Sequence, residues 1–134
     1  MSVDRWRTEL AAAGAIAAGS ALGGTSRVAI AMLLPHAPWL ATALVNVTGA
    51  FLIGLLHALT LPGGRLPLGV RWRQAMLGGY LGGFTTFSIL SAETLALIDA
   101  GQLGAATTNL AGGLTLALLA VTLGHALGAR WKAA

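Results

Sequence analysis

The chain alternates between long apolar blocks and short links in which proline, glycine and charged residues collect. Four blocks are long enough to cross a membrane, because a helix of roughly 20 residues spans a hydrocarbon core of about 30 Å. They cover about residues 10–34, 39–61, 74–98 and 103–129. The pattern predicts an all-α membrane protein with four transmembrane helices, in which residues 1–134 form a single domain.

The composition supports a membrane protein and argues against several other classes. The chain is 56% hydrophobic and 9% charged, whereas charged residues make up about a quarter of a soluble domain. It has no cysteine, and its three histidines and four carboxylates form no recognisable metal site or nucleophile–base pair, so we do not expect an enzyme. The net charge of +4 does not indicate nucleic-acid binding, because the basic residues form no patch interleaved with aromatics.

The basic residues follow one side of the predicted bundle. Apart from Arg27, every Lys and Arg lies before the first block, between the second and third, or after the fourth: Arg5, Arg7, Arg65, Arg71, Arg73, Arg130 and Lys132. The two other links carry none. Cytoplasmic links of membrane proteins are enriched in Lys and Arg, so we expect both termini in the cytoplasm.

The third block contains a stretch that is poorly suited to a helix, GGYLGGFTTFS over residues 78–88. Glycine costs a helix about 1 kcal/mol relative to alanine, and threonine is restricted at χ1. We expect the third helix to break near mid-membrane. Freed backbone groups at that depth commonly form ion sites, although a continuous, tightly packed helix is the alternative.

Polar residues inside the blocks are candidates for a structural or functional role, because a charge at the bilayer centre costs about 2.5–3.5 kcal/mol on the insertion scale. Thr42 and Asn46 share one helix face, and their donors could replace water around an anion; an interhelical hydrogen bond is the alternative. Arg27 is either a fixed positive charge at the mouth of an anion path or a side chain that reaches the interface. Glu93 is a candidate functional carboxylate, and His57 is interpreted as a structural or interfacial histidine.

A further polar face follows the expected break. Phe87, Leu90, Ser91 and Thr94 share one face of the helix, and the positive edge of a phenyl ring can meet an anion without a formal charge. The spacing alone does not distinguish this from ordinary packing. It also does not choose among Ser88, Ser91 and Thr94 as ion contacts.

Together these residues resemble the small bacterial fluoride channels of the Fluc, or CrcB, family. The resemblance covers all four blocks and is carried by GGTSR at 23–27, TALVNVTG at 42–49, and GGFTTFS at 82–88 with Glu93 beyond it. It implies a channel of a bacterial inner membrane, surrounded by lipid. Such a channel exports cytoplasmic fluoride down its electrochemical gradient and so lowers intracellular fluoride.

The resemblance also implies an antiparallel dimer with two fluoride pathways along the subunit interface. The broken third helices would meet at the centre, where the backbone carbonyls of Gly82 and Thr85 from both subunits would hold a structural sodium ion. The pathway residues it implies are Asn46 as the pore asparagine, Phe87 as the first pore phenylalanine and Arg27 as the vestibule arginine, with Thr42 and Ser91 as secondary polar candidates. Ser88 and Glu93 complete our candidate pathway residues.

Two positions depart from the family pattern. The second pore phenylalanine falls at Leu90, which removes one aromatic edge. A tyrosine common in the family's fourth helix falls at Asn109 in a loose alignment. Both departures affect the details of the ion track.

The strong Lys and Arg bias bears on the assembly, since an antiparallel homodimer requires a chain that inserts in both directions. We therefore hypothesise that the partner is an oppositely oriented homologue, with a second copy of the same chain as the alternative. A functional antiparallel homodimer formed by this chain expressed alone would contradict that hypothesis.

Two other functions are considered. A proton-coupled multidrug-type transporter would typically carry its membrane carboxylate in the first helix, where this chain has only Glu9 at the block's edge. A non-transporting membrane scaffold would not explain the glycine–threonine break or the stripe of Thr42 and Asn46.

Overall fold

The computed structural model describes residues 3–131, all of whose regular structure is helical. Four helical rods in it are long and apolar enough to cross a membrane: Arg5–Leu33, Pro38–Leu59, Val70–Asp99 and Leu103–Arg130. The predicted all-α class with four spans is confirmed. Lys132, one of the basic residues used for the orientation, lies outside the described residues.

The first two rods are single helices, and the other two are composite. The first rod is α1 (Val3–Leu33), which starts before the predicted span, and the second is α2 (Pro38–Leu59). The third consists of α3 (Val70–Gln74), a π-helical segment η1 (Ala75–Leu81), α4 (Gly82–Phe84) and α5 (Phe87–Asp99). The fourth consists of α6 (Leu103–Thr107), a π-helical segment η2 (Thr108–Gly112) and α7 (Gly113–Arg130).

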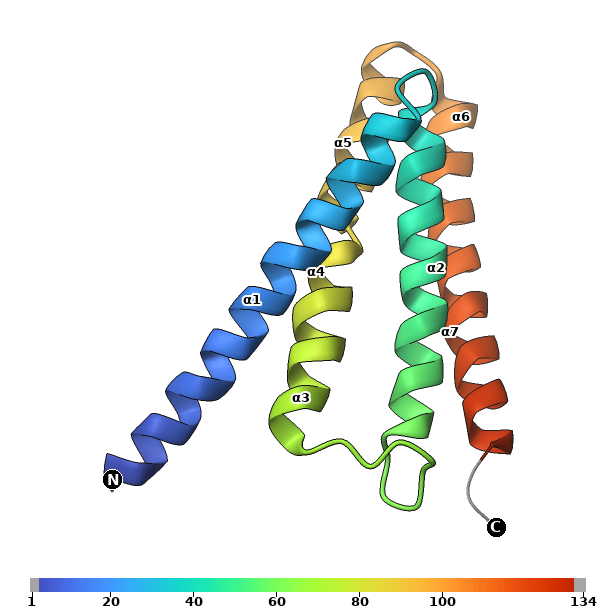
Figure 1. The fold of residues 1–134 in the computed structure, drawn as a ribbon. Helices are drawn as coiled ribbons and strands as arrows, with labels where there is room; N and C mark the ends of the chain where they lie inside the picture. Colours follow the sequence, from blue (N-terminus) through green and yellow to red (C-terminus); the bar gives the residue numbers. More distant parts are fainter. Residues whose placement is uncertain (1–2, 132–134) are drawn as a thin grey trace.

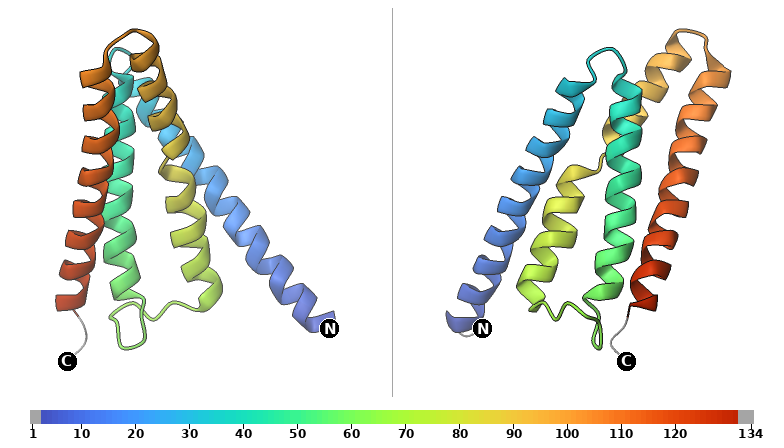
Figure 2. Two further views of the ribbon diagram at one scale, coloured as in Figure 1. Left: turned by 180° about the vertical axis from the view of Figure 1, so that it is seen from behind. Right: turned by 45° about the vertical axis from the view of Figure 1, so that its right-hand side comes forward.

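The rods run up and down, so both ends of the described chain and the α2–α3 link lie at the same end of the molecule (Figure 1). α2 packs along α7, while α1 crosses η1 and α4 and leans away from the bundle toward its N-terminus (Figures 1 and 2). Large apolar side chains such as Leu22, Leu118 and Leu123 are mostly exposed. A lipid environment accommodates such a surface, since lipid tails are as apolar as leucine.

Two glycines show how the rods approach so closely. A Cβ added at Gly23 of α1 would overlap the Tyr80 carbonyl oxygen, and one at Gly54 of α2 would overlap the Val121 carbonyl oxygen. Backbone therefore lies directly against backbone at both crossings. Small residues serve this purpose in lipid, where close packing replaces the hydrophobic drive.

The third rod is broken at Thr85 and Thr86, which confirms the predicted break. Thr85 has ψ 158° and Thr86 has φ −149° and ψ 120°, so both are extended between α4 and α5. The glycines that precede them remain helical. Gly83 instead packs against α1, since a Cβ there would overlap the Ser20 carbonyl oxygen.

Candidate ion pathway

Asn46 of α2 holds the backbone of the broken third rod. Its Nδ2 donates to the Thr86 carbonyl at 2.8 Å, and its Oδ1 accepts from the Thr86 N–H at 2.7 Å. These two bonds fix which way the amide points. They also satisfy both backbone groups of Thr86, which would otherwise lie unpaired at mid-membrane depth.

Thr86 itself begins the next helix. Its Oγ1 accepts from the Ile89 N–H at 3.2 Å and lies 3.2 Å from the Ser88 Oγ. A threonine N-cap is a usual helix start, because its oxygen satisfies one of the free N–H groups of the first turn. The N-terminus of α5 is thereby fixed at the break, beside Asn46.

The break also frees two backbone carbonyls. In a continuous helix the Thr86 and Ile89 N–H groups would donate to the carbonyls of Gly82 and Thr85. Here they donate to the Asn46 Oδ1 and the Thr86 Oγ1 instead. Both carbonyls of the implied sodium site therefore lack their helical partners.

Arg27 of α1 points to this break. Its Nη1 donates to the Thr85 carbonyl at 3.0 Å, and its buried Nε has no hydrogen-bond partner among the described residues. The side chain thus places a positive charge beside the break. Arg27 lines neither of the two cavities described below.

Glu93 of α5 and Thr42 of α2 form a polar pair between their helices. The Thr42 hydroxyl donates to Glu93 Oε1 at 2.7 Å, whereas Glu93 Oε2 is buried without a partner in the described part of the chain. A hydroxyl carries a single hydrogen. The only hydroxyl hydrogen of Thr42 is therefore used in the bond to Glu93 and is not available to an anion.

Asn109 and Leu90, the two positions that depart from the family pattern, lie near this pair. Asn109 Nδ2 donates to the Thr94 Oγ1 at 3.1 Å, and Thr94 Oγ1 donates to the Leu90 carbonyl at 2.7 Å. Leu90 is buried and lies against Gly113, where a Cβ would come within 3.3 Å of its side chain. These contacts join α5 to η2 and α7.

Two adjoining cavities follow the polar residues. The larger, of about 710 Å³, is lined by Trp39, Glu93, Asn109 and mainly apolar side chains. The smaller, of about 230 Å³, is lined by Thr86 and Phe87 among others. Asn46, Leu90 and Gly113 line both. The cavities therefore neighbour each other at Asn46, and together they line a candidate track between the Trp39 end of the bundle and the break.

The structure brings some predicted site residues onto this track and leaves others outside it. Asn46, Glu93 and Phe87 line the cavities, and Phe87 is 63% exposed. Ser91 lines neither cavity and donates to the Phe87 carbonyl of its own helix at 2.9 Å. Ser88 lines neither and lies against Thr86.

Sequence reasoning gave no role to Thr86 or Asn109. Thr86 was part of a helix-breaking stretch, yet it is both the N-cap of α5 and the group that Asn46 holds. A threonine directly before a helical run is a readable N-cap signal. Asn109 was noted only as a departure, because its neighbours come from another rod.

Available hydrogen-bond donors decide what the track could accept. Each asparagine amide carries two N–H hydrogens, and Asn46 and Asn109 each use one of them on Thr86 and Thr94. Each keeps a second hydrogen in a cavity-lining side chain. The positive end of the α5 dipole also lies at the break, so the surroundings of Asn46 favour an anion.

Comparisons with known proteins identify the family to which the chain is similar. The model of the family described as "CrcB-like protein, Camphor Resistance (CrcB)" matches residues 14–125. A protein of Opitutus terrae named "Fluoride-specific ion channel FluC" is 45% identical, over 82% of this chain and 86% of its own. One of Rhodopseudomonas palustris named "Fluoride-specific ion channel FluC 1" is 42% identical, over 97% of this chain and 95% of its own.

Proposed function

The chain belongs to the CrcB family, and from that premise we propose that it is a fluoride-selective channel of a bacterial inner membrane. It is an ion channel rather than an enzyme. It releases cytoplasmic fluoride and so lowers the intracellular concentration. An inside-negative potential drives an anion outward by about 2.3 kcal/mol per 100 mV, so no coupled reaction is required.

The observation that carries the pathway is that Asn46 lines both cavities while its Nδ2 makes one hydrogen bond, which leaves its second N–H for an ion. Fluoride is small and strongly hydrated, so it enters a protein only where donors replace its water. Asn46 offers a donor that is rigidly aimed, because Thr86 holds both ends of the amide. Phe87 lines the same cavity and can offer a ring edge.

Asn109 supplies a second donor in the larger cavity. Its amide is held by Thr94 and keeps one N–H free. Glu93 lines this cavity as well, and its Oε1 already accepts a hydrogen bond from the Thr42 hydroxyl. We therefore assign the ion contacts there to the asparagine amides, and we assign Thr42 to holding the carboxylate through its 2.7 Å hydrogen bond.

Gly82 and Thr85 are the proposed ligands of a structural sodium ion between two subunits. Their carbonyls lack helical partners, and a carbonyl oxygen can accept two bonds, so Thr85 can serve Arg27 and a cation together. The guanidinium is a positive neighbour and weakens this fit at Thr85. If the site forms, replacing sodium by N-methylglucamine will lower the thermal stability of the assembly, and an unchanged melting temperature would argue against it.

The proposed assembly is an antiparallel dimer whose partner is an oppositely oriented homologue. Every described Lys and Arg except Arg27 lies at or near the end that holds both termini and the α2–α3 link (Figure 1). By the positive-inside tendency this end faces the cytoplasm. A chain with so uniform a bias inserts in one direction, so the opposite orientation has to come from another chain.

Fluoride efflux from liposomes tests the channel function. Purified protein is reconstituted in vesicles loaded with KF, and valinomycin starts efflux that a fluoride electrode records, with KCl-loaded vesicles as the control for selectivity. We expect rapid release of fluoride, and no release of chloride, from the preparation that contains both subunits of the proposed assembly. Because the proposed partner is a second chain, the measurement is repeated with an oppositely oriented homologue present, and absence of efflux in both preparations would overturn the proposal.

Two variants locate the pathway in the same assay. Asn109→Ala removes the second donor of the larger cavity and is expected to slow efflux about tenfold, the equivalent of one hydrogen bond of about 1.5 kcal/mol. Thr48→Val is the matched control. Thr48 lies on α2 beyond Asn46, is exposed, donates to the Leu44 carbonyl of its own helix and lines neither cavity, so its efflux should equal that of the wild type.

A further inference from the structure

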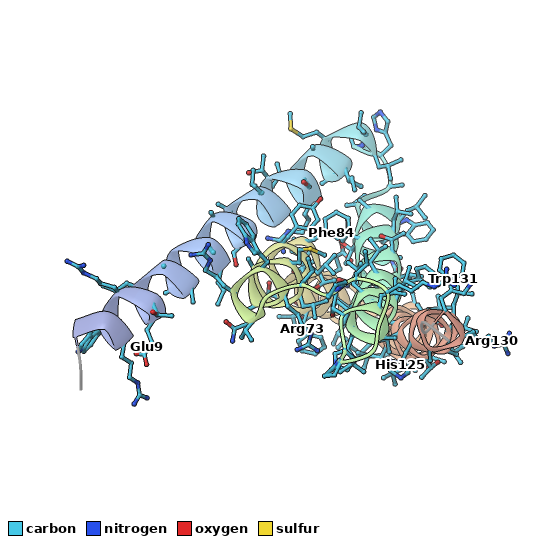
Figure 3. All side chains as sticks on the ribbon, turned by 60° about the horizontal axis from the view of Figure 1, so that its bottom comes forward. Glu9, Arg73, Phe84, His125, Arg130 and Trp131 are labelled. Atoms are coloured by element: carbon cyan, nitrogen blue, oxygen red, sulfur yellow. The ribbon has the colours of Figure 1, made fainter. Side chains whose placement is uncertain are left out.

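Two histidines face each other at the end of the bundle that holds the termini, far along α2 and α7 from the cavities. The ring centres of His57 and His125 are 5.8 Å apart, with an angle of 42° between the ring planes. His57 is half-buried and His125 is exposed. In Figure 3, in which this end comes forward, His125 lies where α2 and α7 adjoin. Neither ring makes a hydrogen bond to another side chain or backbone group of residues 3–131.

The backbones beneath the two rings are held at a fixed distance. A Cβ at Gly54 would lie 2.8 Å from the His125 backbone nitrogen and would overlap the Val121 carbonyl oxygen. On the opposite helix, a Cβ at Gly124 would overlap the Phe51 carbonyl oxygen, and one at Gly128 would lie 2.7 Å from the Leu55 carbonyl oxygen. The two helices cannot slide apart without losing these contacts. The histidine pair is therefore presented by a rigid support rather than by loops.

We propose that His57 and His125 together bind a divalent transition-metal ion of the zinc class. Two imidazoles sharing a Zn²⁺ through bonds of about 2.0–2.1 Å have ring centres on the order of 5–6 Å apart, which matches the observed spacing. Imidazole is a preferred ligand of Zn²⁺, Cu²⁺ and Ni²⁺. The pair needs only rotation of the rings about their side-chain bonds to aim one nitrogen of each at a shared ion.

The surroundings define what kind of site this is. No group of three His, Cys, Asp or Glu side chains gathers anywhere in the described part of the chain, so water completes the coordination. A site with two protein ligands leaves open positions and exchanges its ion readily. Arg73 bonds to Thr60 three residues beyond His57, and Arg130 follows His125 on α7; both positive charges disfavour a cation and limit its affinity.

Binding at this pair would cross-link α2 to α7. α2 carries Asn46 and α7 carries Gly113, both of which line the cavities. The bound ion would thus link α2 and α7, two helices that line the cavities, at a point away from the cavities. Metal binding at this site would stabilise the packing of α2 against α7 whichever ion the channel conducts.

Metal titration of the full chain, freed of any histidine tag, tests the proposal. Zn²⁺ binding in detergent is measured by equilibrium dialysis, with His57→Gln and His125→Gln as the test variants. His36→Gln is the matched control, because His36 lies in the link at the opposite end of the bundle. We expect one ion per chain in the wild type and in His36→Gln, and affinity lowered roughly tenfold or more in each test variant.

A spectroscopic measurement keeps the test decisive if a variant does not fold. Electron paramagnetic resonance of the wild type with one equivalent of Cu²⁺ should show coupling to two imidazole nitrogens, and Zn²⁺ should raise the melting temperature because it binds the folded state. Coupling to a single nitrogen in the wild type would overturn the proposal. Equal Zn²⁺ binding by wild type, His57→Gln and His125→Gln would do so as well, and would leave the pair as a ring contact only.

Discussion

Most hydroxyl groups within the spans are occupied by bonds inside the protein. Thr42 donates to Glu93, Ser91 to the Phe87 carbonyl and Thr94 to the Leu90 carbonyl. A hydroxyl has one hydrogen to give, whereas an amide has two. This difference explains why two asparagines, and not the more numerous threonines and serines, retain donors for an ion.

Substitution of Asn46 should affect both stability and conduction. Asn46→Ala leaves the Thr86 N–H and carbonyl unpaired, and each buried unpaired group costs about 1–3 kcal/mol. Asn46→Asp should be worse, because it keeps the acceptor for the N–H but sets a carboxylate oxygen against the Thr86 carbonyl. Thermal unfolding in detergent and fluoride efflux would both be recorded, with Thr48→Val as the reference. An Asn46→Ala variant as stable as the wild type would show that the two hydrogen bonds to Thr86 are not formed.

At this scale the sequence identified the right residue types but not their partners. Asn46 was a candidate because it shares a helix face with Thr42 and lies deep in an apolar block. Its partner Thr86 is 40 positions away, and Glu93 is 51 positions from Thr42. Such pairings depend on how the helices cross, which no local pattern encodes, so the loss of the Thr42 donor to Glu93 was not foreseeable.

At the scale of elements, the third rod assigns close helix contact and the helix break to different residues, although both kinds of residue lie in one stretch of its sequence. Glycines and threonines both disfavour a helix, so the composition predicted a break without fixing its position. Gly79 and Gly83 contact α1, and the break lies at the two threonines. At Gly79 and Gly83 the backbone of α1 fills the space that a side chain would take. Thr86 lies outside the helix and there accepts the N-cap hydrogen bond from Ile89.

The close crossing of α2 and α7 can be tested with one methyl group. Gly54→Ala places a Cβ on the Val121 carbonyl oxygen and should destabilise the protein by about 1–3 kcal/mol, the usual cost of overpacking. Gly14→Ala is the control, because nothing lies within 4 Å of its added Cβ. It should be neutral or stabilising by up to about 1 kcal/mol, since alanine favours the helix. Equal melting temperatures for the two variants would contradict the packing described here.

At the scale of the whole molecule, the bilayer makes the outline predictable. Four apolar blocks of suitable length and three short links leave up-and-down rods as the simple solution. The lean of α1 is different (Figure 1). Its surface is apolar nearly all round, so no stripe specifies which face meets the bundle, and its position comes from the glycine contacts with η1 and α4.

The charge distribution leads to a prediction about assembly. Expressed alone, this chain should insert with both termini in the cytoplasm, as read by reporter fusions at either end, and should show little fluoride efflux. Co-expression with an oppositely oriented homologue should restore efflux. Reversing the bias, for example with Arg71 and Arg73 changed to Gln and lysines added to the α1–α2 link, should produce mixed orientations. Robust efflux from the unmodified chain alone would mean that the bias does not prevent dual insertion.

The two hydrogen bonds between Asn46 and Thr86 also constrain how the protein is inserted into the membrane. The third rod crosses the membrane only as a composite, because α5 alone has 13 residues and reaches about 20 Å of the roughly 30 Å hydrocarbon core. If the third segment entered lipid alone, the N–H and the carbonyl of Thr86 would have no hydrogen-bond partner. Both groups are paired once the second segment, which carries Asn46, is already in place. Synthesis delivers Asn46 first, so we expect the second and third segments to leave the translocon as a hairpin. A glycosylation-reporter assay should find the third segment poorly integrated when the second carries Asn46→Leu.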